Sequence, residues 1–312
     1  MSLLSSISKK VDVYEVGPRD GLQNELRTLA TADKARLIEG LIASGLKRIE
    51  VSSFVSPRWI PQLADAEKLM SLLPRREGVI FTALVPNLKG LERARAAGLQ
   101  EAAVFLSVTE SHSQKNINKS VADAISTARE VAQGARDAGM RVRCYLSTVW
   151  GCPYEGLTPV ARVVEVVKQL ADIGFYQLSL GDTIGVGTPG HTAEIVTEVS
   201  KIVGLQQIAL HLHDTRGTAL ANALVGLSMG VTTFDASIGG LGGCPYAPGA
   251  AGNLATEDLV FMLHGMGVQT GINLDRLVEA GELAQELIGR KLSGKYLQAA
   301  LGEREKQTRP SS

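Results

Sequence analysis

The stretch IALHLHDTRGTALANALVGLSMG (208–230) combines an apolar run, a short polar turn and a second, longer apolar pattern. Residues 208–213 have the composition of a buried strand, whereas the apolar spacing over 219–229 is that of a helix. Gly230 then offers the left-handed conformation in which many helices end. This segment therefore predicts one strand, turn and helix unit of an α/β protein.

The same unit recurs along the whole chain. We expect strands at 11–16, 48–52, 79–85, 102–108, 141–147, 176–180, 208–213 and 232–237. Helical patterns occupy 31–43, 63–72, 88–97, 121–138, 159–173, 192–203, 219–229 and 256–266. Strands that alternate with helices pair in parallel through crossovers, and eight such units close a (β/α)₈ barrel. The sequence predicts a single (β/α)₈ TIM barrel domain over 1–312, with an additional C-terminal helix at 274–287 and a disordered tail at 303–312.

Composition limits the kind of partner. The chain has 312 residues and is 45% hydrophobic, which is enough for a large core, and its 32 basic and 32 acidic residues cancel. This balance gives no indication of a nucleic-acid partner or an anionic membrane surface. No apolar stretch is long enough to span a bilayer. We therefore expect a small-molecule partner.

The three cysteines, Cys144, Cys152 and Cys244, show no spacing typical of a disulfide framework. Residues 1–10 do not resemble a secretory leader or a convincing transit peptide. We therefore expect a reducing compartment and a cytoplasmic protein. Cys144, on an expected strand, is interpreted as a buried structural thiol, while the role of Cys152 stays open.

His211 and His213 are separated by one residue in the expected strand 208–213. Alternate side chains of a strand share a face, so both imidazoles point the same way and could bind one divalent metal ion. An isolated pair of this kind could instead be hydrogen-bonded in the core. Oxygen ligands are available where other expected strands end, at Asp20, Asp182 and Asn253. Because barrel active sites form at the carboxyl ends of the strands, these residues are expected to converge on one mouth.

Nine separated strings, spread over roughly residues 11–290, then point to a family. The strings are VGPRDGLQNE (16–25), SSFVSP (52–57), PNLKG (86–90), KNIN (115–118), GCPYEG (151–156), SLGDTIGVGTP (179–189), HLHDT (211–215), GGLGGCPYAPGA (239–250) and GNLATEDLV (252–260). Together, and in this order, they resemble the 3-hydroxy-3-methylglutaryl-CoA lyase family.

The resemblance implies cleavage of 3-hydroxy-3-methylglutaryl-CoA into acetyl-CoA and acetoacetate, with the help of a divalent metal ion. It implies four metal ligands, which are Asp20, His211, His213 and Asn253. Two imidazoles, a carboxylate and an amide oxygen suit Mg²⁺ or Mn²⁺, and would also accept Co²⁺ or Zn²⁺.

Several residues are candidates for the chemistry. Arg19 is the candidate for stabilising the enolate oxygen, with a structural ion pair as the alternative. Glu50, Asp182 and His211 could each relay the hydroxyl proton or orient neighbouring groups. The resemblance assigns proton delivery to Cys244, in a glycine-rich loop expected to act as a lid; a buried thiol is the alternative.

Substrate contacts are expected from other loops. Gln23 is interpreted as positioning the substrate or the metal shell, and Lys115 and Asn116 as loop residues on the side where coenzyme A would bind. The single histidines are expected to be solvated or to cap helices; they are His112, His191 and His264.

Alternative functions stay open. A related barrel aldolase or condensing enzyme would share the metal ligands, and a non-catalytic metal-binding or acyl-CoA-binding protein would need only part of the site. Segment 105–112, Trp150 and Arg216 depart from the family pattern, so a lyase for another 3-hydroxyacyl-CoA is a further alternative. A homodimer is suggested by the resemblance alone.

Overall fold

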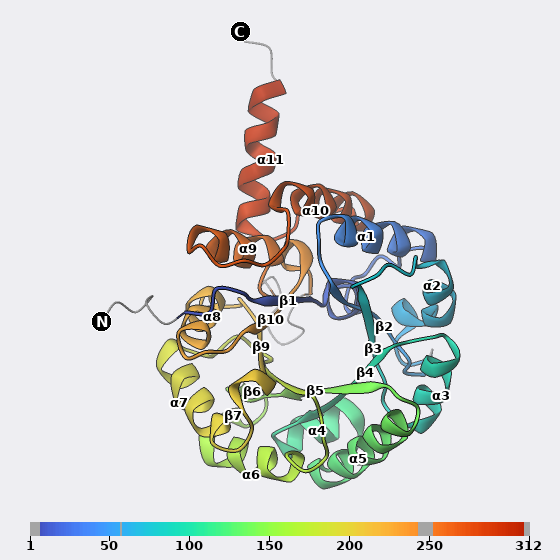
Figure 1. Ribbon diagram of the computed structural model, residues 1–312, viewed down its shortest axis with the longest axis vertical. Coiled ribbons are helices and arrows are strands. Elements are labelled where there is room, and N and C mark those ends of the chain that lie inside the picture. The colour runs from blue at the N-terminus through green and yellow to red at the C-terminus, as the bar shows by residue number, and fades with distance from the viewer. Residues whose placement is uncertain (1–6, 57, 243–251, 309–312) are drawn as a thin grey trace.

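A closed barrel of parallel strands forms the centre of the molecule, with helices around it (Figure 1). The computed structural model describes residues 7–56, 58–242 and 252–308. Within these residues the strand order around the barrel is β1-β10-β9-β8-β5-β4-β3-β2. The strands are β1 (Asp12–Glu15), β2 (Arg48–Ser53), β3 (Ile80–Leu84), β4 (Glu101–Ser107), β5 (Arg141–Ser147), β8 (Gln177–Asp182), β9 (Ile208–Leu212) and β10 (Thr233–Ala236). The predicted (β/α)₈ barrel is therefore confirmed.

Strand β9, which contains His211 and ends directly before His213, shows why these segments are so apolar. Every residue of β9 is buried, because one face of the strand lines the barrel interior and the other packs against helices. In the register of the sheet, His211 is the partner of Gly181 on β8 and of Asp235 on β10. A charged residue of β10 therefore lies beside the first histidine.

All of the helices predicted around the barrel are present, and their ends differ from the expected ones by a few residues. They are α1 (Thr31–Ala43), α2 (Ala66–Leu72), α3 (Leu88–Ala96), α5 (Val121–Asp137), α6 (Val160–Leu170), α7 (Pro189–Ser200), α8 (Ala219–Ser228) and α9 (Thr256–Gly265). Their ends depend on local capping, which apolar periodicity does not report. At α7, for example, Thr188 caps the helix and Pro189 takes its first position.

Shorter elements were not predicted. They are the helix α4 (Glu110–Ile117), the hairpin strands β6 (Gly151–Cys152) and β7 (Gly156–Leu157), and the turns η1 (Gly17–Gly21), η2 (Pro61–Leu63), η3 (Leu205–Gln207) and η4 (Ile238–Gly240). The placement of Lys115 and Asn116 in a loop was wrong, since both lie on α4. Helix α4 has the sequence ESHSQKNI, and only His112 and Ser113 are buried, so no apolar stripe marks it.

Two helices follow α9, where one had been predicted. Helix α10 (Leu274–Ile288) matches the expected one, and α11 (Lys295–Thr308) projects from the barrel in Figure 1. The predicted disorder of 303–312 is wrong for 303–308, and 309–312 lie outside the described residues. Asp258 of α9 accepts the backbone N–H groups of Lys295 (3.1 Å) and Tyr296 (2.6 Å), which caps α11. The charged sequence that suggested disorder also consists of good helix formers, and Arg304 pairs with Glu282 of α10 at 3.4 Å.

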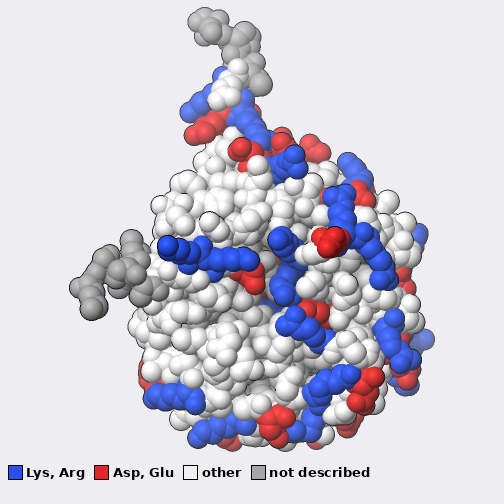
Figure 2. All heavy atoms as spheres, viewed as in Figure 1, with Lys and Arg blue, Asp and Glu red and all other residues white. Residues whose placement is uncertain are grey.

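Charges are mixed over the surface. Figure 2 shows basic and acidic side chains interspersed on one face, with several Lys and Arg side chains near its centre. Within the described parts of the chain, no helix combines the length and the apolar character needed to cross a membrane.

Candidate active site

A cavity of about 450 Å³ opens where the barrel strands end. The histidine pair and the turn that follows β1 lie on its wall, together with residues of β3, β4, β5 and β8 and of the segments that follow β2, β3, β4 and β8. The polar side chains around it include Arg19, Asp20, Gln23, Asn87, His112, Asn116, Lys119, Ser147, Thr183, His211 and His213. Residues far apart in the chain therefore meet at one mouth, as the barrel topology requires.

Three of the predicted metal ligands form one cluster. A ligand atom of each of Asp20, His211 and His213 lies within 4.8 Å of the other two. The Nε2 atoms of the two histidines are 3.3 Å apart, and His211 Nε2 lies 3.8 Å from Asp20 Oδ2. One carboxylate and two imidazoles at this spacing fit a divalent cation such as Mg²⁺ or Mn²⁺.

Asn253 lies beside this cluster because its backbone forms a bridge with that of His213. Its Nδ2 atom donates hydrogen bonds to Asp20 Oδ2 (2.8 Å) and to the carbonyl of Leu241 (3.0 Å). The amide nitrogen, and not the oxygen, therefore faces Asp20. Binding of a metal ion through the Asn253 oxygen requires the amide to turn over.

Arg19 is held by two carboxylates. Its Nε donates to Glu50 Oε2 and its Nη1 to Asp20 Oδ1, both at 2.6 Å. The guanidinium also lies 5.3 Å from the centre of the Tyr145 ring. Arg19 reaches this position from η1, a turn that starts at Gly17 and Pro18 directly after β1. Its orientation is therefore fixed before any substrate is present.

These contacts set the charge states of the two carboxyl groups. Burial acts to raise the pKa of Asp20, but the charges of Arg19, His211 and His213 bring it well below its usual value. Burial also raises the pKa of Glu50, and there it outweighs the opposing effect of Arg19. Glu50 is not on the cavity wall, and its Oε1 has no hydrogen-bond partner among the described residues.

His213 is neutral at pH 7. Its burial, followed by the proximity of His211, lowers its pKa to about 4. A neutral imidazole is the form that binds metal ions. Its Nδ1 atom is buried and lacks a hydrogen-bond partner within the described part of the chain.

A buried network below the histidines was not predicted. Asp235 Oδ2 lies 3.2 Å from His211 Nδ1, and Asp235 Oδ1 forms a 2.5 Å ion pair with Arg143 Nη2. Arg143 and Asp235 are both fully buried. The signal was present in the sequence, since a charged residue in the middle of a buried strand requires a partner. What the sequence did not indicate is that the two residues pair with each other.

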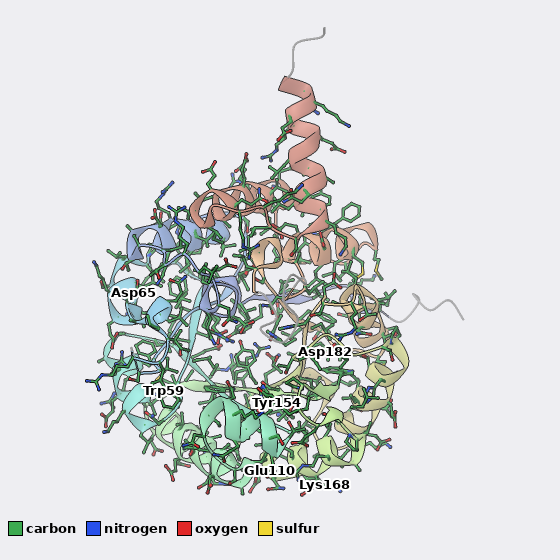
Figure 3. The ribbon with its side chains drawn as sticks, turned by 180° about the vertical axis from the view of Figure 1, so that it is seen from behind. Trp59, Asp65, Glu110, Tyr154, Lys168 and Asp182 are labelled. Atoms are coloured by element: carbon green, nitrogen blue, oxygen red, sulfur yellow. The ribbon has the colours of Figure 1, made fainter. Side chains whose placement is uncertain are left out.

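Other candidates lie apart from the cluster. Asp182 is not on the cavity wall, and its two oxygens accept the backbone N–H groups of Val186 (3.0 Å) and Gly187 (2.8 Å). Lys115 lies over the ring of Tyr154, 3.8 Å from its centre. Asp182 and Tyr154 are labelled in Figure 3, where the barrel is seen from behind. Cys244 lies outside the described residues.

Three further expectations concerned single residues. His112 was expected to be solvated or to cap a helix, which is wrong: it is buried on the cavity wall, with Nδ1 2.7 Å from Ser107 Oγ. Helix α4 brings it inward, and this helix has no apolar pattern. Cys144 is a buried free thiol, as predicted. Cys152 is also buried, and its sulfur accepts the N–H of Tyr154 at 3.4 Å, which favours a structural role.

Comparisons with known proteins agree with this geometry. A family model described as HMGL-like matches residues 10–284. The mitochondrial hydroxymethylglutaryl-CoA lyase of Mus musculus is 49% identical over 298 residues, which cover 96% of this chain and 92% of that protein. The crystal structure of hydroxymethylglutaryl-CoA lyase from Pseudomonas aeruginosa is 45% identical, with a TM-score of 0.93, and the match covers 95% of this chain and 99% of that chain.

A second solved structure is an HMG-CoA lyase from Acinetobacter baumannii in complex with coenzyme A and 3-methylmalate. It is 35% identical, with a TM-score of 0.90, and the match covers 99% of this chain and 100% of that chain. Sequence and structure thus agree over nearly the whole length of the barrel. The chain belongs to the HMGL-like family, together with the hydroxymethylglutaryl-CoA lyases.

Proposed function

We propose that the protein is a hydroxymethylglutaryl-CoA lyase, which cleaves 3-hydroxy-3-methylglutaryl-CoA into acetyl-CoA and acetoacetate. The observation that carries this proposal is the cluster of Asp20, His211 and His213 beside a fixed Arg19 in one cavity. The similarity to lyases over 96% of the chain supports the same reaction. In this reaction the tertiary hydroxyl loses its proton, the adjacent carbon–carbon bond breaks, and the thioester fragment leaves as an enolate that takes up a proton.

The proposed cofactor is Mg²⁺ or Mn²⁺, held by Asp20, His211 and His213, with Asn253 as a further ligand. A bound divalent cation would make the substrate hydroxyl more acidic and hold the substrate in place. The choice between these two metals is open, because the donor set suits both.

Arg19 is the residue proposed to stabilise the enolate oxygen. Two of its nitrogens are occupied by Glu50 and Asp20, and Nη2 has no hydrogen-bond partner among the described residues. A guanidinium fixed in this way offers a donor and a full positive charge where the negative charge develops. In this proposal Glu50 acts through Arg19, whose direction it sets.

His211 and Asp182 remain candidates for handling the hydroxyl proton, and the bonds of Asp182 to backbone N–H groups favour a role in holding the loop at 183–187. Cys244 is proposed to deliver the proton to the enolate carbon. That role rests on the family resemblance of the string 239–250.

Substrate binding is proposed along the same cavity. Gln23 and Asn116 lie on its wall, and Lys115 is the residue next to Asn116 on α4. We propose that these residues contact the coenzyme A part of the substrate, in line with the coenzyme A bound by the Acinetobacter baumannii neighbour. A homodimer and a cytoplasmic location are proposed as well. The two described cysteines, which are unpaired thiols, support a reducing compartment.

The test is an assay of thioester cleavage with purified full-length protein. Release of acetoacetate from 3-hydroxy-3-methylglutaryl-CoA should require added Mg²⁺ or Mn²⁺ and should stop with a chelator. Other 3-hydroxyacyl-CoA thioesters, tested in parallel, should turn over more slowly. A protein that binds the metal ion and the thioester but cleaves neither substrate class would overturn the proposal in favour of a binding protein.

A further inference from the structure

The buried ion pair between Arg143 and Asp235 lies inside the barrel, below the cluster of Asp20, His211 and His213. Both side chains are fully buried, and a buried ion pair loses so much hydration that it is weak evidence of a stabilising role. Replacing such a pair with apolar residues often stabilises a protein. The contact of Asp235 with His211 gives this pair a second role.

The orientation of Asp235 is fixed from several sides. Arg143 donates from Nη2 to Asp235 Oδ1 (2.5 Å), from Nε to Gln177 Oε1 (2.9 Å) and from Nη1 to the hydroxyl of Tyr145 (3.1 Å). Ser179 Oγ donates to Asp235 Oδ2 at 2.7 Å. Strands β5, β8 and β10 all contribute to this network, so the carboxylate cannot turn without breaking bonds to two of them.

The same Oδ2 atom faces His211 Nδ1 at 3.2 Å. A carboxylate paired with an arginine can only accept, so the proton of the His211 ring belongs on Nδ1. The lone pair of Nε2 then points toward Asp20 and His213, where a metal ion would bind. Asp235 therefore selects the ring form of His211 that can act as a ligand.

His213 has no equivalent support. Its Nδ1 is buried without a partner among the described residues, and its Nε2 lies 3.3 Å from His211 Nε2. The described residues therefore give His211, and not His213, a carboxylate partner that selects its tautomer.

We propose that Arg143 and Asp235 are positioning residues that hold His211 in its metal-binding tautomer. This inference rests on the metal site of the proposed function. It concerns the order of the site before any metal or substrate is present, so it can be tested in the absence of catalysis.

The first test reads the tautomers directly. The chain has only five histidines, so ¹⁵N-labelling of histidine and two-bond ¹H–¹⁵N correlation spectra can resolve each ring. In the metal-free full-length protein, His211 should carry a proton on Nδ1. Addition of Mg²⁺ should leave this proton on Nδ1. A His211 ring protonated only on Nε2 in the metal-free protein would overturn the proposal.

The second test inverts the tautomer by design. In Asp235→Asn, Arg143 will hold the amide oxygen, which turns the amide nitrogen toward His211 Nδ1. A donor at that position forces the His211 proton onto Nε2, where it blocks metal binding. The dissociation constant of Mn²⁺, measured by calorimetry, should rise by about 10- to 100-fold. Unchanged Mn²⁺ binding in the folded variant would contradict the proposal.

Arg143 is tested by two variants. Arg143→Met should weaken Mn²⁺ binding, because Asp235 then loses its main restraint, and Arg143→Lys should restore part of the affinity. If Arg143→Met does not fold, Asp235→Asn and the wild-type spectra still decide the question.

Glu101→Gln is the matched control. Glu101 is also a buried carboxylate at a barrel strand, but it pairs with Arg48 and Arg141 and accepts from Tyr176, without contacting either histidine. This variant should keep the wild-type tautomers and Mn²⁺ affinity, even if its thermal midpoint falls. An equal loss of Mn²⁺ affinity in Glu101→Gln would show that the effect of Asp235→Asn is only structural. Lyase activity of the wild type is measured separately, so an inactive protein with the expected tautomers would reject the proposed function and not this inference.

Discussion

At the scale of single residues, the replacement of His213 tests the metal centre most directly. His213 is buried directly after β9, its Nε2 lies 3.3 Å from His211 Nε2, and its backbone forms a bridge with that of Asn253. His213→Ala should therefore lower Mn²⁺ affinity at least about tenfold, which corresponds to about 1.4 kcal/mol, and lower activity with it. Excess Mn²⁺ should restore part of the activity.

Calorimetry and circular dichroism check this expectation together. His264→Ala is a suitable control, because His264 lies at the end of α9 and contacts Thr270. A folded His213→Ala protein with wild-type Mn²⁺ affinity would remove His213 from the set of ligands.

The Arg19→Lys variant distinguishes a role of Arg19 in catalysis from a role in substrate binding. The Arg19 guanidinium bonds simultaneously to Glu50 and Asp20, a geometry that the single ammonium group of lysine cannot reproduce. If Arg19 stabilises charge that appears mainly in the transition state, Arg19→Lys should raise the activation free energy by about 3–5 kcal/mol. This increase should appear as a lower kcat, with KM changed only a few-fold. Steady-state kinetics at saturating Mg²⁺ provide the measurement. A large increase in KM at normal kcat would make Arg19 a substrate-binding residue instead.

At the scale of elements, Glu15 joins the first strand to the segments that follow the last strand. Its Oε1 accepts the N–H groups of Gly17 (2.8 Å) and Ile238 (2.9 Å), and its Oε2 accepts from Thr256 Oγ1 (2.7 Å). This one side chain therefore connects β1 with η4 and the start of α9. Burial raises its pKa from 4.5 to about 7, although these hydrogen bonds oppose the shift.

The raised pKa predicts a pH-dependent stability. The contribution of protonated Glu15 to the free energy of unfolding is fully present below about pH 4.5 and is lost as the pH rises through about 7. Glu15→Gln should remove this loss, worth roughly 3 kcal/mol at most. Its amide oxygen can keep both N–H bonds while its nitrogen donates to Thr256.

Urea denaturation of the wild type and of Glu15→Gln at pH 5 and pH 7.5 tests this pH dependence of stability. The wild type should lose more stability than Glu15→Gln between these values, whereas Glu257, with a pKa raised by burial to about 8, contributes in both proteins. Identical pH slopes would show that Glu15 is ionised throughout the range.

At the scale of the whole molecule, the metal ion joins separate parts of the barrel. Asp20 follows β1, His211 belongs to β9 and His213 follows it, so a bound ion links segments that lie far apart in the sequence. The unfolded chain does not hold these three ligands together, so the metal ion binds only the folded protein. Metal binding should therefore stabilise the fold by roughly 2.7 kcal/mol when the free metal concentration is 100 times Kd. The thermal midpoint should rise with added Mn²⁺ and fall with a chelator. In His213→Ala the thermal midpoint should depend much less on Mn²⁺. If the thermal midpoint of the wild type did not change with Mn²⁺, the proposed metal centre would be contradicted.

The sequence alone determined the barrel strands, the helices around them and several of the residues that meet at the mouth. Periodicity is a local property, and eight alternating units leave one closed topology, so Arg19, Asp20 and His211 could be assigned to one site from spacing and resemblance. Elements without apolar periodicity, such as α4, were missed for the same reason.

Only the tertiary structure decided how these residues interact. Arg143 and Asp235 are 92 positions apart, and no local pattern indicates that they pair across the barrel interior. Asp182 looked equivalent to Asp20 in the sequence, yet its oxygens bind backbone N–H groups away from the cavity. A strand pattern reports which side chains share a face, but partners, hydrogen-bond directions and charge states depend on neighbouring strands and on burial, which exist only once the barrel has closed.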